Sequence, residues 1–279
     1  MTKWFETYRG VVKPWECDIV QHLTIAYYFE FFAAATRNLF DLLGEGTEAC
    51  LLASPARRYA TFEGELRAGA GFHILTSVTG IDADALRLGH QVVDSVTGKT
   101  LTWLAERRAP SQACTSAVRE RLANLAVAWP GPQTPDPPPP RTVHGRPTAR
   151  DRVKPSEIGE DGAMSQPAQV HRFSAANMQM LAAVGMTADY MHEQRRGFST
   201  FALDLIQVGD ATVGEMIAVT TLISHLGNSS LRLVHRMTGR DGRDIASLVQ
   251  SGVHLDMDAR RSAAIPETLR PAIEALVNL

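Results

Sequence analysis

The sequence is poor in cysteine and has no long uncharged apolar run. Its three cysteines, Cys17, Cys50 and Cys114, are too few and too unevenly spaced for a disulfide framework, and no Cys-x-x-Cys pair suggests a zinc site. No stretch reaches the roughly 18 apolar residues that span a bilayer. The N-terminus has no signal-peptide pattern. We therefore expect a cytoplasmic protein with no metal site and no membrane partner.

A charge excess of one sign is also missing. The 28 basic and 30 acidic side chains give a formal net charge of −2. A nucleic-acid-binding surface would show as a clustered basic excess, so we expect no nucleic-acid partner. The length of 279 residues and the 44% hydrophobic content are sufficient for a buried core and suggest two domains.

Proline is concentrated in one segment, residues 129–147. Proline fixes φ and has no backbone N–H to donate, so this segment is neither a helix nor a central strand. The composition is typical of a semi-rigid connector. We therefore predict a first domain at 1–128, a Pro-rich linker at 129–147 and a second domain at 148–279.

The sequences on either side of this linker are similar to each other. Residues 12–14, Val-Lys-Pro, recur at 153–155, and the same spacing aligns Phe32 with Phe173. Further along, Leu-Arg-Leu-Gly-His at 86–90 recurs as Leu-Arg-Leu-Val-His at 231–235 after a modest insertion. The chain is therefore predicted to be a duplicated domain.

Each repeat has the same predicted order of elements. A short strand ends near Val12 or Val153, and a long apolar helix follows, with Thr24 as a possible N-cap and Gly44 as a stop in the first repeat. Four strands come next, predicted at 58–67, 72–82, 85–94 and 99–108, and at 197–208, 215–225, 230–239 and 244–256. The helices are expected at 24–43 and 166–184. This order gives an α+β class, in which an antiparallel sheet wraps a central helix.

The segment from Pro14 to Thr24, which leads into the first helix, holds the most informative motif. It resembles the opening motif of hotdog-fold acyl-CoA thioesterases of the 4-hydroxybenzoyl-CoA and betainyl-CoA types. That motif has an Asp, then Gly-His-Met-Asn at the helix start, then Tyr, Phe and Ala along the helix. The residues in register with it are Asp18, His22, Thr24, Tyr28, Phe32 and Ala35. Gln21 stands where the family has glycine, and Thr24 stands where it has asparagine.

The resemblance implies two tandem hotdog domains. Since one such domain leaves helix and sheet surface to bury, we expect the two to pair as a covalent pseudo-dimer. Remaining sheet surface could also support a homodimer of these pseudo-dimers.

Thioester hydrolysis needs a nucleophile or a base, together with a donor for the developing oxyanion. Asp18 lies just before a helix N-terminus, whose unpaired N–H groups suit a thioester oxygen. The sequence leaves open whether Asp18 acts as nucleophile or base, or only as a loop or cap residue. His22 could bind substrate, orient Asp18 or tie the loop to the helix. Candidate substrate-binding residues are Gln21, Thr24, Tyr28 and Glu63.

The second repeat has lost the reactive pair, since Gly159 and Ala163 occupy the positions of Asp18 and His22. Glu160 and Asp161 lie close by in the sequence, so the second loop still has carboxylates that could act in a site. Residues that both repeats retain are more simply structural. Glu16 with Glu157 and His90 with His235 are therefore expected to support the fold.

The predicted activity is hydrolysis of an acyl-CoA thioester to the free acid and CoA, with CoA as part of the substrate and no separate cofactor. Two alternatives remain. A hotdog hydratase or dehydratase also uses Asp and His, but with one more residue between them and an Asn-Pro that is absent here. A non-catalytic acyl-CoA-binding module would not need the carboxylate that the first repeat keeps.

Overall fold

The computed structural model describes residues 3–44, 47, 55–109, 114–135, 145–159 and 161–277. The chain divides into two compact units, Met1–Asp136 and Pro137–Leu279, so that the division falls inside the predicted linker. Within the described ranges, no helix is long and apolar enough to cross a membrane.

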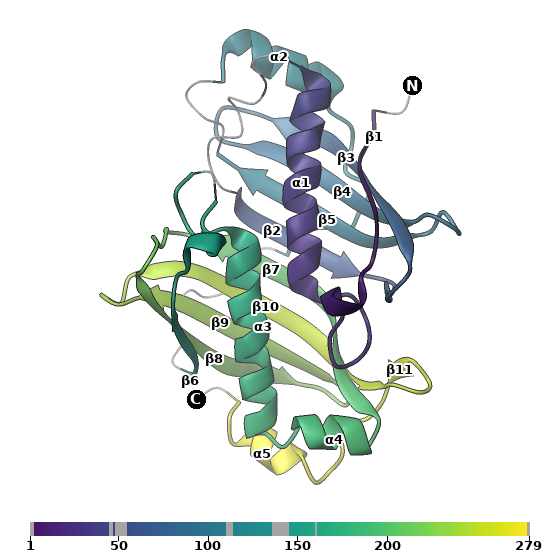
Figure 1. Ribbon diagram of the computed structural model, residues 1–279, viewed down its shortest axis with the longest axis vertical. Coiled ribbons are helices and arrows are strands. Elements are labelled where there is room, and N and C mark those ends of the chain that lie inside the picture. The colour runs from purple at the N-terminus through teal and green to yellow at the C-terminus, as the bar shows by residue number, and fades with distance from the viewer. Residues whose placement is uncertain are drawn as a thin grey trace. The chain divides into compact units, whose positions relative to one another are not determined.

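The first domain is a five-stranded antiparallel sheet with one long helix on one face (Figure 1). The strand order is β1-β3-β4-β5-β2. The elements are β1 (Phe5–Val11), the 3-10 turn η1 (Pro14–Glu16), α1 (Ile25–Leu43), β2 (Pro55–Phe62), β3 (Gly71–Ile81), β4 (Leu86–Asp94), β5 (Thr100–Arg108) and α2 (Ser116–Leu125). Apart from α2, these match the helix and strands predicted from the sequence.

The second domain repeats this order with the sheet β6-β8-β9-β10-β7 and a short strand β11 beside β10. The elements are β6 (Arg146–Arg152), η3 (Pro155–Glu157), α3 (Gln166–Ala183), α4 (Ala188–Glu193), β7 (Arg196–Gln207), β8 (Met216–Leu226), β9 (Ser230–Gly239), β10 (Asp244–Asp256), β11 (Arg261–Ser262) and α5 (Arg270–Glu274). The duplication and the α+β hotdog architecture of both domains are therefore confirmed. β6 begins within the segment assigned to the linker.

The core of each domain lies between the helix and the sheet. In the first domain α1 buries Phe29, Phe32, Leu39 and Phe40 completely, at the three- and four-residue spacing of one helix face. α3 is less apolar and buries Gln169 and Asn177 beside Phe173. The second helix therefore packs a more polar face on its sheet than the first.

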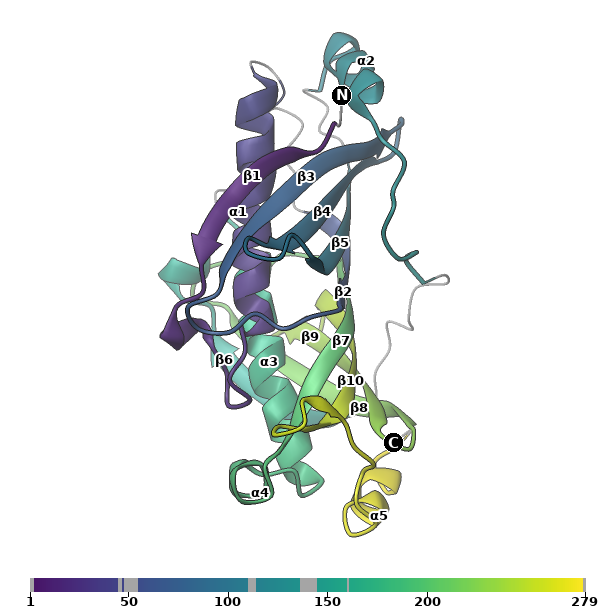
Figure 2. The same cartoon turned by 90° about the vertical axis from the view of Figure 1, so that its right-hand side faces the viewer.

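The chain that follows α2 packs on the face of the first sheet away from α1, as Figure 2 shows. The Trp129 ring contacts Trp103 edge-on at 5.5 Å, and its Nε1 donates to the Pro132 carbonyl oxygen at 2.9 Å. A Cβ at Gly89 would lie 2.5 Å from the Trp129 ring, so β4 needs glycine there. The start of the Pro-rich segment is thus attached to the first domain.

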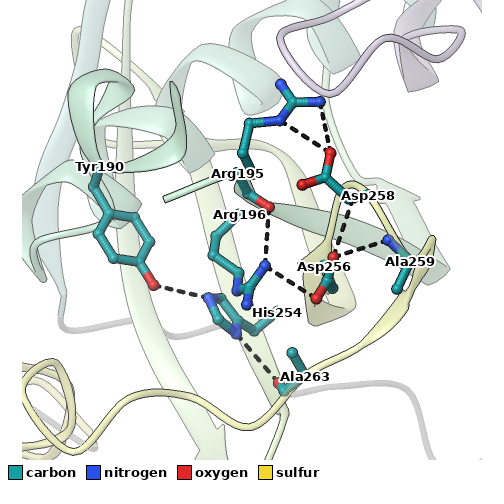
Figure 3. Close-up of polar contacts among 8 residues, drawn as sticks. All are labelled: Tyr190, Arg195, Arg196, His254, Asp256, Asp258, Ala259 and Ala263. Carbon is teal, nitrogen blue, oxygen red and sulfur yellow. Dashed lines mark hydrogen bonds and ion pairs between the residues drawn. The ribbon is translucent and has the colours of Figure 1, made fainter. Parts of the chain in front are cut away.

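A polar network fixes the C-terminal end of β10 in the second domain (Figure 3). The buried His254 contacts the Tyr190 hydroxyl of α4 through Nε2 at 3.0 Å and the Ala263 carbonyl oxygen through Nδ1 at 3.2 Å. Arg196 pairs with Asp256 at 3.1 Å. Since both ring nitrogens of His254 have partners, this cluster ties α4 and the chain after β11 to the sheet.

Cys114 corrects one expectation about the cysteines, since this buried residue is disulfide-bonded. Cys17 is a free thiol, and burial raises its pKa. Disulfides are rare in a reducing cytosol, so the cytoplasmic location stays a prediction.

Candidate active site

The loop between η1 and α1 has a backbone that the second domain reproduces bond for bond. In the first domain Asp18 N–H donates to the His22 carbonyl at 3.0 Å, and Leu23 N–H donates to the Leu66 carbonyl at 2.7 Å. In the second, Gly159 donates to Ala163 at 2.8 Å, and Met164 donates to Ala211 at 2.7 Å. The two loops therefore differ in their side chains, while their backbone hydrogen bonds are the same.

Asp18 and His22 lie together in this loop. His22 Nδ1 is 3.3 Å from Asp18 Oδ2, and Asp18 Oδ1 accepts the Val20 N–H at 3.0 Å. The His22 side chain is 14% exposed and that of Asp18 is 31% exposed. Among the described residues, the buried His22 Nε2 has no hydrogen-bond partner. The predicted pair thus forms in space and leaves one buried imidazole nitrogen without a partner among the described residues.

Gln21 occupies the tip of the loop with φ of 67°. This left-handed conformation favours glycine, which is the residue that the resembling motif has at this place. The second domain has Gly162 there, with φ of 79°. The exposed Gln21 therefore keeps the turn that glycine makes elsewhere, at a cost in backbone strain.

The two helix starts differ in their capping. Ser165 caps α3, since its side chain accepts the Ala168 N–H at 3.4 Å. Thr24 is the N-cap residue of α1, but within the described structure its side chain makes no cap hydrogen bond. The prediction that the Thr24 side-chain oxygen caps α1 was therefore wrong. The start of α1, shortly after His22, thus lacks the side-chain cap that α3 has, and its Tyr27 N–H donates to the Thr24 carbonyl at 3.0 Å instead.

Tyr28 lies one turn into α1 and is buried. Its ring meets Phe62 edge-on at 5.2 Å, and burial raises the pKa of its hydroxyl, as do the negative charges of Glu65 and Asp18. The role of Tyr28 in substrate binding stays a prediction.

Glu63, a predicted substrate-binding residue, is exposed just after β2, and its backbone N–H donates to the Leu101 carbonyl at 2.8 Å. Its role stays a prediction. Glu65, which the sequence analysis did not single out, acts on Tyr28 through its charge and precedes Leu66, whose carbonyl accepts the Leu23 N–H.

In the second loop Asp161 takes over one structural contact of Asp18. Asp161 Oδ1 accepts the Ala163 N–H at 3.1 Å, and a Cβ on Gly159 would lie 3.1 Å from the same oxygen. In the first loop Asp18 Oδ1 lies 3.4 Å from the equivalent His22 N–H. Asp161 therefore helps to hold the second loop, where Ala163 stands in place of His22. Glu160, the other carboxylate named for this loop, lies outside the described residues.

The residues that both repeats retain lie in matching structural positions. Glu16 Oε2 accepts the Lys13 N–H, and Glu157 Oε2 accepts the Lys154 N–H, both at 2.8 Å. These bonds hold η1 and η3 in place, as expected for fold-supporting residues.

The two retained histidines are fully buried under the helices. His90 Nδ1 contacts Thr76 Oγ1 at 3.0 Å, and His235 Nδ1 contacts Thr221 Oγ1 at 2.7 Å. Burial lowers the pKa of each ring to about 3. Both histidines are therefore neutral parts of the core rather than site residues.

A buried ion cluster occupies the sheet face under α1. Glu106 accepts from Arg58 Nε at 2.9 Å and from Arg108 Nε at 2.7 Å, and His90 Nε2 lies 3.9 Å away. Burial by itself would raise the Glu106 pKa, but Arg108 and Arg58 outweigh it and lower that pKa to about 2. These arginines are core residues and are not available as surface cations for CoA.

No group of three or more His, Cys, Asp or Glu side chains that could hold a metal occurs in the described part of the chain.

Residues 153–273 match the family model of the thioesterase-like superfamily. The resemblance to thioesterases is therefore confirmed. The match covers the second domain, in which Gly159 and Ala163 stand at the positions of Asp18 and His22. A search of curated proteins gave no match.

Three solved thioesterase structures are similar to the chain over nearly its whole length. An acyl-ACP thioesterase from Bacteroides thetaiotaomicron has a TM-score of 0.68 at 11% identity, covering 90% of this chain and 98% of its own. A protein assigned as an oleoyl thioesterase from Lactobacillus plantarum has a TM-score of 0.70 at 11% identity, covering 94% and 97%. The 12:0-ACP thioesterase from Umbellularia californica has a TM-score of 0.63 at 13% identity, covering 90% and 94%. At such identities the likeness shows the fold.

Proposed function

We propose that the chain hydrolyses an acyl-CoA thioester to the free acid and CoA, with a single active site at Asp18 and His22. The observation that carries this proposal is the pairing of His22 Nδ1 with Asp18 Oδ2 at 3.3 Å, next to a His22 Nε2 without a partner. A carboxylate and an imidazole in contact are a recurring arrangement for activating a nucleophile.

The roles of the two side chains follow from which atoms are occupied. Asp18 Oδ1 holds the loop through Val20, and Oδ2 faces His22, so the carboxylate orients the imidazole. His22 Nε2 then either takes a proton from the attacking water or contacts the thioester oxygen. Direct attack by Asp18 on the carbonyl is the alternative within the same site.

The uncapped start of α1 supplies the second requirement of the reaction. The developing negative charge on the thioester oxygen is stabilised by backbone N–H groups at the helix start and by the positive end of the helix dipole. In the second domain the Ser165 side chain occupies this position, and the reactive pair is absent. Both differences support one active site per chain.

The test is a thiol-release assay over short, long, aromatic and betaine-like acyl-CoA substrates. Asp18→Asn keeps the acceptor for Val20 and removes the charge, so kcat should fall by about 10²-fold or more while the fold is kept. Asp161→Asn is the matched control, because it alters the corresponding loop of the second domain, and it should leave kcat unchanged. Wild-type kcat in Asp18→Asn, or equal losses in the two variants, would refute the assignment.

A further inference from the structure

Trp15 is the most exposed aromatic side chain near the Asp18 loop, with 71% of its surface exposed. The fold does not explain it. η3 forms the same turn with Ser156 in its place, and the Glu16 and Glu157 N–H groups donate at 3.0 Å to Lys13 and Lys154. Because the turn closes equally well on serine, the indole is not needed to build it.

Two cationic side chains accompany this indole. Lys13 Nζ lies 5.7 Å from the centroid of the Trp15 ring, and 57% of the Lys13 side chain is exposed. Arg67 follows β2, and its side chain is 52% exposed. The turn that holds Arg67 is bonded to the end of β1, because the Gly69 N–H donates to the Val12 carbonyl at 2.9 Å. Glu16 lies 3.5 Å from Lys13, and Glu65 lies 4.0 Å from Arg67, yet over half of each cation remains open to solvent.

These features occur only in the domain that has the reactive pair. Where the first domain has Trp15 and Arg67, the second has Ser156 and Thr212. Lys13 has the counterpart Lys154, as the shared turn requires. The indole and the arginine are thus lost together with Asp18 and His22, although the backbone around them is kept.

We propose that Trp15, Lys13 and Arg67 bind the nucleotide half of coenzyme A. A flat exposed indole stacks on a purine, and ammonium and guanidinium groups bind phosphate oxygens. Trp15 precedes Asp18 by three residues, which span about 10 Å at most. This inference rests on the proposed function only in taking CoA as the leaving group.

The experiment measures binding and needs no turnover. The full chain and its variants are titrated calorimetrically with coenzyme A and with pantetheine, which lacks the nucleotide. Trp15→Ser copies the second domain and should fold normally. It should weaken coenzyme A binding about tenfold and leave pantetheine binding unchanged. Trp15→Phe should recover part of the loss, and Arg67→Thr should weaken coenzyme A binding in a salt-dependent way.

Val96→Ser is the matched control, because Val96 is an 88% exposed apolar residue on the turn between β4 and β5. It should not change either affinity. The proposal is overturned if Trp15→Ser binds coenzyme A as the wild type does, if it loses pantetheine affinity equally, or if it slows only substrates carried on an acyl carrier protein. Trp15-dependent binding of coenzyme A without hydrolysis of any thioester would instead refute the proposed function alone.

Discussion

The two domains place different chemistry at the same positions of the same fold. Under α1, Glu106 is held between two buried guanidiniums, whereas under α3 the equivalent Gln250 donates to Thr200 Oγ1 at 2.6 Å. Leu203 takes the place of Arg58. Since the second domain folds around a neutral version of this core, the hotdog architecture does not require the buried charges.

The loops that precede α1 and α3 also share one backbone structure and differ in their side chains. Their backbone hydrogen bonds are the same, and the bridge between Cys17 and Leu23 recurs between Ile158 and Met164. The reactive side chains are present in one loop only. A duplicated backbone therefore preserves the scaffold of a site after its chemistry is gone.

The largest expected effect on stability comes from Glu106→Gln, which copies Gln250 into the first domain. It leaves the Arg58 and Arg108 charges buried without their carboxylate, so the free energy of unfolding should fall by about 3–5 kcal/mol. Denaturant titration measures it. Adding Arg58→Leu, which copies Leu203, should recover part of the loss. An unchanged denaturant midpoint in Glu106→Gln would show that Glu106 does not stabilise the buried Arg58 and Arg108 charges.

Acid should lower the free energy of unfolding of both domains by a similar amount, since each has one fully buried histidine under its helix. His90 and His235 each have a folded pKa of about 3, below the unfolded value of 6.5. The unfolded chain therefore binds protons that the folded chain does not, and stability is lost as the pH falls from about 6.5 towards 3. Between about pH 6.5 and 5 each histidine should cost up to about 2 kcal/mol. Unfolding free energies that are flat over this range would contradict the neutral buried rings.

A smaller effect is expected from returning the carboxylate to the second loop. In Gly159→Asp the new side chain meets Asp161 Oδ1, which lies 3.1 Å from the Cβ position, so like charges repel. Stability should fall by about 1–2 kcal/mol. Adding Asp161→Val, the residue of the first loop, should restore it. If Gly159→Asp alone is as stable as the wild type, Asp161 does not occupy the place of the lost carboxylate.

The smallest effect separates the two helix starts. Ser165→Ala removes the cap of α3 and should cost about 1 kcal/mol. Thr24→Ala should cost much less, because the Thr24 hydroxyl makes no cap hydrogen bond within the described structure. Thermal unfolding of both variants measures the difference. Equal losses would show that α1 is capped in solution and would remove the uncapped helix start from the proposed mechanism.

Much of the fold was accessible from the sequence, because the two repeats confirm each other. The helix at 24–43 was expected and found at Ile25–Leu43, and the β4 and β9 hairpins turn at Gly98 and Gly242, both with positive φ. Short helices such as α4 were not predicted, because six residues are too few to show a helical periodicity of apolar residues.

The site was accessible only in part. Asp18 and His22 lie four residues apart, so their contact followed from the motif. Glu106 joins an arginine 48 residues away, and no pattern in the sequence pairs them. For this reason, arginines at strand ends look like solvent-exposed cations until their partners are known.

The threonine–histidine contacts under each helix also belong to longer polar chains. Thr7 Oγ1 donates to the Ile74 carbonyl at 3.3 Å and lies 2.7 Å from Thr76 Oγ1, which in turn contacts His90. Thr148, Thr221 and His235 repeat this arrangement from the Val219 carbonyl. Each imidazole is thus anchored through two hydroxyls to a backbone oxygen of its own sheet, so that both halves of the protein hold the ring under the helix in one orientation.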